Sequence, residues 1–311
     1  MFSGGVAGIE QWRELISSRR QEQIWLYATE ESIYHSPPVQ SKPYVVVDNL
    51  RYNLTYGYHI KADISQPFGK IVPSEHPSKP TIDPKPSDLA PVAWMSSRDH
   101  MYWNRSRFVR DLGNYLSIDK YGQMGGKELP RKGNNSTETL KKYKFYLAFE
   151  NSCCSHYITE KFWIALSSYE AVPIVVGPSK ADYEKVAPPE SFIYADDFES
   201  FESLADYVNK VSSTPELYSK FHEWREKYEI KTASKADMFP FIIDSKACTL
   251  LEFLRDKAWR QDLPLSPGMD PYGEDWLKSC TPCGKHDWLR QYGLEGNTFL
   301  EDLGKKEYRQ R

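Results

Sequence analysis

Strand and helix patterns alternate regularly through the middle of the chain, and this alternation limits the fold more than any other feature. Short apolar runs typical of buried strands alternate with stretches whose apolar residues recur every three or four positions. The runs that favour strands are Val92–Ser96, Phe145–Phe149, Val172–Val176 and Phe192–Tyr194, and those that favour helices are Arg105–Leu116, Thr159–Ser168 and Phe201–Val211. Such alternation predicts an α/β fold with a parallel sheet and helices on both faces. Ligands of such sheets bind at the carboxyl ends of the strands.

The region before this alternation has a different character. Glu10–Arg19 favours a helix, and Gln23–Ala28 and Tyr44–Asp48 favour strands. Six prolines then cluster between Val72 and Pro91, where they fix φ and remove backbone donors. The cluster excludes helix and central strand, so we place a boundary between two lobes there.

The length of 311 residues is greater than that of one typical domain, which agrees with two α/β lobes. We predict a first lobe over residues 1–72, a proline-rich linker over 73–91 and a second lobe over 92–235. The second lobe includes a helix at Glu216–Lys227. A tail with weaker periodicity follows over 236–311.

The charges argue against two classes of partner. The 40 basic and 43 acidic residues give a net charge of −3 without a long run of either sign, unlike a nucleic-acid-binding or polybasic membrane surface.

No window reaches the roughly 18 to 20 apolar residues that cross a bilayer, and residues 1–20 lack the apolar centre of a signal peptide. Four Asn-x-Ser/Thr triplets, which accept glycans only in a secretory lumen, begin at Asn53, Asn104, Asn134 and Asn135. They point modestly to the secretory route.

The five cysteines do not form a dense framework. They are Cys153, Cys154, Cys248, Cys280 and Cys283. The last two form a C-x-x-C with His286 nearby, but no second pair stands at the spacing of a zinc finger. We therefore prefer disulfides or unpaired thiols, and we predict no metal site.

The stretch over residues 143–177 carries the most chemical information. A buried strand ends at Glu150 and Asn151, and Thr159 is placed to cap a helix whose first turn contains Lys161. Backbone N–H groups at a helix start, with an ammonium beside them, make an anion site suited to a diphosphate. The alternative is an ordinary strand–helix–strand unit whose polar residues are solvated.

The same stretch contains FENS followed by YITEK, and it resembles the donor-binding signature of the alpha-1,3-fucosyltransferase family. Further blocks of that family are matched downstream, in the same order and spacing, by VPIVVGP, APPESFIYADDFES, LADYV and FHEWREKY. Upstream, a helix that begins at Arg105 and the segment IDKYG resemble another family block. The resemblance extends from about Ile24 to Tyr228.

The resemblance implies a GT-B-type fold, with two Rossmann-like lobes built on parallel sheets and a truncated first lobe. The second lobe would hold GDP-fucose, and the first, partial lobe would present the acceptor. The implied activity is transfer of fucose, in alpha-1,3 linkage and with inversion at the anomeric carbon, to GlcNAc of a glycan on a glycoprotein or glycolipid. The implied location is the Golgi lumen, with a membrane anchor in a segment that this chain lacks.

The resemblance also assigns roles to individual residues. Arg105 and Lys161 match positions that neutralise the pyrophosphate, and Glu160 matches one that contacts ribose or the fucose side. No cofactor is obligatory, and a divalent cation is at most stimulatory. The other donor-side candidates are Asn151, Tyr157 and Glu150.

Inversion needs a base for the proton of the attacking hydroxyl, and a carboxylate is the usual choice. The segment IWLYATEESIYHSP resembles the family motif that supplies this base and aligns Trp25, Glu31 and His35 with it. Glu31 is therefore the predicted catalytic base. Glu30 is the alternative, because a shift of one residue in the alignment would select it.

Several positions depart from the family pattern. His156 stands where the family has Asp, and Cys154 matches a cysteine whose family partner is replaced near Ser96. Cys154 is therefore expected to be free or strained against Cys153. The tail C-x-x-C, whose family partners lie in the absent region, is expected to pair internally or with Cys248.

The sequence is also compatible with a function other than fucose transfer. The departures and the short first lobe also suit a catalytically silent glycan- or nucleotide-sugar-binding protein on the same fold. A dinucleotide or ATP enzyme is disfavoured, because the chain has no G-x-G-x-x-G or P-loop. Core GlcNAc, lactosamine and LacdiNAc all remain open as acceptors.

Overall fold

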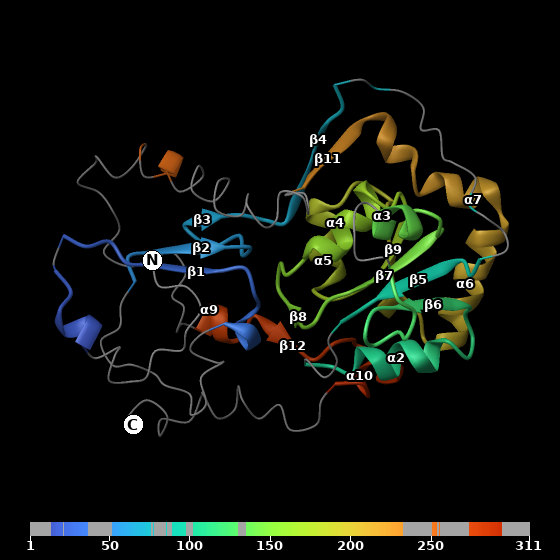
Figure 1. Cartoon of the computed structure of the whole chain (residues 1–311), viewed down its shortest axis with the longest axis horizontal. Helices are drawn as coiled ribbons and strands as arrows, with labels where there is room; N and C mark the ends of the chain where they lie inside the picture. Colours follow the sequence, from blue (N-terminus) through green and yellow to red (C-terminus); the bar gives the residue numbers. More distant parts are fainter. Residues whose placement is uncertain are drawn as a thin grey trace. The chain divides into compact units, whose positions relative to one another are not determined.

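The protein is described from a computed structural model, which covers residues 14–20, 22–36, 52–75, 77, 85, 89–97, 102–129, 135–232, 251–253, 255 and 274–293. The chain divides into two compact units (Figure 1). The first comprises Met1–Pro67, Lys235–Cys280 and Glu295–Arg311, and the second comprises Phe68–Ser234 and Thr281–Leu294. Within the described ranges, no helix has the length and apolar character needed to cross a bilayer.

The first unit contains a small parallel sheet in the order β1-β2-β3. Its strands are β1 (Leu26–Thr29), β2 (Leu54–Gly57) and β3 (Ile64–Ser65). A short 3-10 helix, η1 (Ile33–His35), follows β1, and α9 (Glu274–Leu277) belongs to the same unit. Gly57 is required where β2 meets β1, because a Cβ there would stand 2.5 Å from the carbonyl oxygen of Thr29.

Helical residues 14–17 and strand β1 agree with the first two predicted elements, although β1 begins and ends later than predicted. The predicted strand Tyr44–Asp48 lies outside the described residues. Strands β2 and β3 were not predicted from the sequence.

The second unit is built on a five-stranded sheet in the order β10-β9-β7-β5-β6, with every neighbouring pair parallel. The strands are β5 (Val92–Met95), β6 (Ile118–Tyr121), β7 (Phe145–Phe149), β9 (Val172–Val176) and β10 (Ile193–Tyr194). The predicted parallel sheet is thus confirmed, and strands β7 and β9 have the predicted bounds.

Helices cover both faces of this sheet (Figure 1). One face packs against α2 (Arg105–Leu112), α6 (Phe201–Ser213) and α7 (Pro215–Lys220). The other packs against α3 (Asn135–Leu140), α4 (Glu160–Ser167) and α5 (Lys180–Val186). Because side chains alternate along a strand, Phe145, Leu147 and Phe149 face the first set and Tyr146 and Ala148 the second.

An antiparallel ribbon crosses the outer side of α4. It consists of β4 (Gly69–Pro73) and β11 (Tyr228–Thr232). Gly69 permits the close approach, since a Cβ at this position would stand 2.4 Å from the Trp163 ring of α4. The ribbon therefore buries one side of the helix that begins beside the candidate site.

Two predicted helices differ in extent. The helix predicted at Arg105–Leu116 ends at Leu112, where Gly113 occupies the C-cap. The helix predicted at Glu216–Lys227 is wrong as a single element, because α7 ends at Lys220 and a 3-10 turn, η3 (Glu223–Glu226), follows. A guanidinium N–H of Arg225 donates to the carbonyl of Leu166 at 2.6 Å, which fixes this turn against α4.

A disulfide joins Cys153 in β8 (Cys153–Cys154) to Cys283, across 130 residues of sequence. The short strand β12 (Cys280–Thr281) and the helix α10 (Asp287–Arg290) flank Cys283. Cys154 and Cys280 are disulfide-bonded as well. The expectation that Cys154 is free or strained against Cys153 is therefore wrong, as is internal pairing of the C-x-x-C. Both cysteines of this motif are consumed in disulfides and are not thiolate metal ligands.

We predict that Cys283→Ser lowers the free energy of unfolding by about 2–5 kcal/mol, because the disulfide closes a long loop in the unfolded chain. Urea denaturation of the parent and the variant measures this difference. Repeating both titrations in excess reductant is the control, since the difference should then largely disappear. A variant as stable as the parent under oxidising conditions would contradict the prediction.

Candidate functional site

The strand order places a ligand site at one edge of the second unit. Numbered along the chain within this sheet, the order is 2-1-3-4-5. The direction of winding reverses between β5 and β7, and in open α/β sheets ligands bind at the carboxyl ends of the strands at such a reversal. The residues that follow these two strands are therefore the first candidates.

Glu150 directly follows β7 and is completely buried. One carboxylate oxygen accepts the backbone N–H of Thr159 at 2.7 Å, and the other accepts the Thr159 hydroxyl at 2.7 Å. The Nζ of Lys161 donates to the second oxygen at 3.1 Å. Glu150 thus ties the end of β7 to the start of α4.

Thr159 occupies the N-cap of α4 but does not cap it with its side chain. Its hydroxyl points to Glu150 and also accepts a 2.7 Å hydrogen bond from Lys161. Thr159 is therefore the N-cap residue, as predicted, but the predicted hydrogen bond from its side chain to the helix backbone is absent. The buried carboxylate competes successfully for the hydroxyl because an unpaired buried charge is far more costly.

Burial and charge act in opposite directions on this pair. Burial raises the pKa of Glu150, and the Lys161 ammonium opposes that shift. Burial alone would lower the pKa of Lys161, but the carboxylates of Glu150 and Glu160 outweigh it and hold the pKa above the usual value. Lys161 therefore remains a cation at neutral pH.

Arg105 supplies a second cation at the same edge. It is the first residue of α2, it is only 6% exposed, and its Nη1 donates to the carbonyl of Phe149 at 3.1 Å. Its positive charge acts against the rise in the pKa of Lys161 without reversing it, which shows that the two cations interact. Trp103 was not predicted as a site residue. Its indole N–H donates to the Glu150 carbonyl at 2.8 Å and fixes the backbone that directly follows β7.

The remaining donor-side candidates lie between the end of β7 and the first residue of α4. Glu160 is half-buried 3.4 Å from the Lys161 ammonium, which lowers the pKa of Glu160 against the effect of burial. Asn151 is half-buried and accepts from the Ser152 hydroxyl, and Tyr157 is buried with its ring edge toward Phe68.

The structure therefore brings Arg105, Glu150, Glu160 and Lys161 into one electrostatic cluster, flanked by Asn151 and Tyr157. Across the described part of the chain, no group of three or more potential metal ligands is present. Arg105 stands at the start of α2 and Lys161 in the first turn of α4, and two cations at neighbouring helix starts can bind an anion with more than one charge.

His156 adds a pair that sequence reasoning did not foresee. Its φ of 63° lies in the left-handed region, and its Nδ1 stands 3.1 Å from the Asp182 carboxylate on α5. Burial alone would raise the pKa of Asp182, but the hydrogen bonds from His156 and Ser179 lower it to about 2. The pair fixes the loop that carries Tyr157 against α5.

Glu31, the predicted base, lies in the first unit. It follows β1 by two residues, and its side chain is exposed. The Thr29 hydroxyl accepts the Glu31 N–H at 3.1 Å, and the Ser36 hydroxyl donates to the Glu31 carbonyl at 3.0 Å. These bonds fix the backbone at Glu31. Glu30, the alternative, is half-buried.

The sequence over residues 86–264 matches the model for the C-terminal part of glycosyltransferase family 10 (fucosyltransferase). Human alpha-(1,3)-fucosyltransferase 4 is 37% identical over 227 residues, which cover 70% of this chain and 41% of that protein. The human 4-galactosyl-N-acetylglucosaminide 3-alpha-L-fucosyltransferase FUT6 is 36% identical over 237 residues, 76% of this chain and 62% of that protein.

The chain therefore belongs to glycosyltransferase family 10, and it spans between 41% and 62% of the length of these two relatives. Among solved structures, it is similar to an alpha1,3-fucosyltransferase with GDP-fucose, with a TM-score of 0.47 and 19% identity over 65% of this chain and 67% of that one.

We predict that Glu150→Gln lowers the free energy of unfolding by about 3–5 kcal/mol, because it leaves the Lys161 ammonium without its buried partner. In a double-mutant cycle with Lys161→Met, the double variant should lose at least about 1 kcal/mol less than the sum of the single losses. Lys141→Met, which removes a partly exposed ion pair with Glu170, is the control and should cost under about 1 kcal/mol. Additive losses for Glu150 and Lys161 would contradict the coupling.

The Asp182 pair predicts a pH dependence of stability. Because the folded-state pKa lies near 2 and the ordinary value is 3.8, the stabilisation is present above about pH 4 and is lost as the pH falls toward 2. We expect the stability difference between the parent and Asp182→Asn to shrink by about 1–2 kcal/mol between pH 4.5 and 2.5. Urea denaturation at both pH values measures it, and Glu184→Gln on the same helix should show no such change. A difference independent of pH would refute the assignment.

Proposed function

We propose that the chain transfers fucose from GDP-fucose, in alpha-1,3 linkage, to GlcNAc of a glycan on a glycoprotein or glycolipid. Family membership supports the reaction class, and the names of the relatives support fucose and the N-acetylglucosaminide acceptor. The observation that carries the proposal is the pairing of Arg105 and Lys161 at the reversal of strand order. A sugar nucleotide needs such a site for its pyrophosphate.

The two cations promote the reaction through the leaving group. As the bond between the fucose anomeric carbon and the GDP oxygen breaks, negative charge accumulates on the departing diphosphate. Arg105 and Lys161 are held in place beforehand by Phe149, Thr159 and Glu150, so they attract this charge without reorganising. Their attraction is strongest in the transition state, which lowers the barrier.

Residues next to these cations make the other proposed contacts with the donor. Glu160 contacts ribose or the fucose side, and Asn151 and Tyr157 line the donor. Glu150 positions Lys161 and is too deeply buried to touch a ligand itself. A divalent cation is at most stimulatory, because the positive charge for the diphosphate comes from side chains.

Inversion requires the acceptor hydroxyl to attack the face opposite to GDP while a base removes its proton. Glu31 is the proposed base. Its position two residues after the carboxyl end of a parallel strand, with a fixed backbone, suits proton abstraction from a sugar hydroxyl. The Golgi lumen is the proposed location of the reaction, and this part of the proposal rests on the family resemblance.

We predict that Lys161→Ala and Glu31→Gln each lower fucose transfer to N-glycan acceptors by at least about a hundredfold. GDP binding should be lost only in Lys161→Ala, because Glu31 acts on the acceptor. Transfer from radiolabelled GDP-fucose and calorimetric titration with GDP measure the two quantities. Lys220→Ala and Glu30→Gln are the matched controls and should retain both.

Each contrary result has a distinct meaning. Transfer that persists in Glu31→Gln and vanishes in Glu30→Gln would move the base by one residue. A parent that binds GDP but transfers to no acceptor would favour a silent nucleotide-sugar-binding protein. A parent that does not bind GDP would overturn the donor site.

A further inference from the structure

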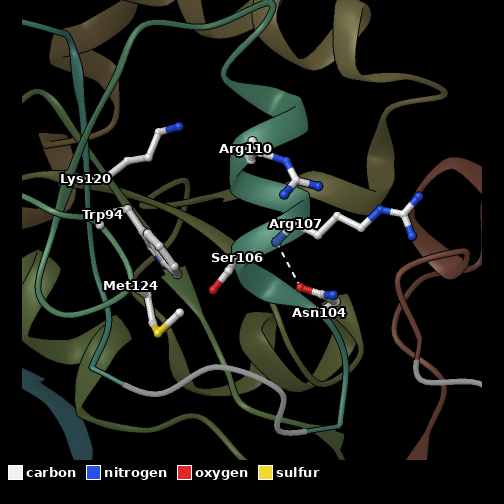
Figure 2. A pocket seen from close by; sticks show the side chains of 8 residues that line it. Trp94, Asn104, Ser106, Arg107, Arg110, Lys120 and Met124 are labelled. Atoms are coloured by element: carbon white, nitrogen blue, oxygen red, sulfur yellow. Dashed lines mark hydrogen bonds between the residues drawn. The ribbon is translucent and has the colours of Figure 1, made fainter.

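A pocket of about 510 Å³ lies beside α2, on the opposite face of the sheet from α4 (Figure 2). It is lined from α2 and its cap, from β5 and β6, and from the loop after β6. The lining residues are Trp94, Asn104, Ser106, Arg107, Arg110, Lys120, Met124 and Gly125. Its size is that of a site for a small organic ligand.

The register separates this pocket from the donor site. Trp94 pairs with Lys120, so both side chains point to the face covered by α2. Ala93 pairs with Tyr146, and both point to the face covered by α4, where Lys161 lies. Arg105 is not among the lining residues, and it donates to the carbonyl of Phe149. The two sites thus share an edge of the sheet but use different side chains.

The pocket carries an excess of positive charge. Arg107, Arg110 and Lys120 line it, and none of its lining residues is acidic. Asp111 contacts Arg107 at 3.8 Å and Arg110 at 3.4 Å, and it also accepts the Tyr292 hydroxyl. Within the described residues, Lys120 forms no ion pair. One carboxylate against three cations gives the lining a net positive charge, although Arg107 and Arg110 are more than half exposed and water solvates part of that charge.

The inner wall combines an apolar surface with an unsatisfied hydroxyl. Figure 2 shows Trp94, Met124 and Lys120 opposite α2, with the Ser106 hydroxyl directed into the space between them. The Ser106 oxygen is buried and has no hydrogen-bond partner. Buried polar groups are nearly always paired, so an oxygen-rich ligand would complete this site.

We propose that this pocket binds an oxyanion ester of a sugar, a phosphate or sulfate monoester. The ester group would lie between Arg110 and Lys120, and the sugar ring would lie against Met124 with one hydroxyl bonded to Ser106, while Trp94, which is only 2% exposed, closes the floor of the pocket. The proposal does not depend on the donor site, because none of these side chains belongs to it.

Calorimetric titration of the full chain with glucose 6-phosphate, glucose 6-sulfate and glucose tests the proposal. Both esters should bind at least about tenfold more tightly than glucose. Arg110→Gln combined with Lys120→Gln should weaken ester binding at least about tenfold, and Ser106→Ala at least about threefold. The control, Lys210→Gln with Arg290→Gln, makes the same charge change elsewhere in the second unit and should leave affinity within about twofold.

Two results would overturn the proposal. The first is that Arg110→Gln with Lys120→Gln and the control double variant bind the esters with equal affinity. The second is that ester binding disappears in Lys161→Ala, which would place the anion in the donor site. Tighter binding of the phosphate or of the sulfate ester supports the site and identifies the group. Thermal denaturation checks folding, and Lys120→Gln alone, with an expected loss of at least about threefold, replaces the double variant if that variant unfolds.

Discussion

The buried carboxylate of Glu150 is the interaction on which the candidate site depends. It stands at the end of the central strand β7 and accepts hydrogen bonds from the backbone and hydroxyl of Thr159 and from the ammonium of Lys161. A carboxylate without exposure to water is tolerated only when it is paired and hydrogen-bonded in this way. The same contacts fix the first turn of α4 and keep Lys161 charged. The buried carboxylate of Glu150 therefore holds a cation at the helix start that follows β7.

The sheet, the β4–β11 ribbon and a disulfide of the second unit hold the two cations of the candidate site in place. The parallel sheet reverses its winding between β5 and β7, which brings the start of α2, with Arg105, to the edge where Lys161 lies. The β4–β11 ribbon covers α4, and the disulfide from Cys153 to Cys283 ties the C-terminal segment to the loop after β7. Arg105 and Lys161 are therefore fixed in position by the surrounding packing before a ligand binds. Cations fixed in this way can stabilise a leaving diphosphate electrostatically.

The sequence predicted those features that depend on local patterns. Strands β7 and β9 were predicted with their observed bounds because Phe145–Phe149 and Val172–Val176 are continuous apolar runs between turn signals. The short strands β2, β3 and β4 have no such run, and their pairing is set by contacts distant in sequence. The same limit explains the partner of Cys283, which is 130 residues away, and the role of Glu150 as a buried support. Family resemblance selected Arg105 and Lys161, but only the fold shows that they act on one another.

We propose that the edge between β5 and β7 binds a diphosphate through Arg105 and Lys161. Titration calorimetry with GDP, GMP and guanosine at constant ionic strength tests it most directly, because the three ligands differ only in phosphate. We expect affinity to fall at least about tenfold from GDP to GMP and again from GMP to guanosine. We also expect Arg105→Ala to remove most of the difference between GDP and GMP. Equal affinities for GDP and guanosine in the parent would contradict the claim.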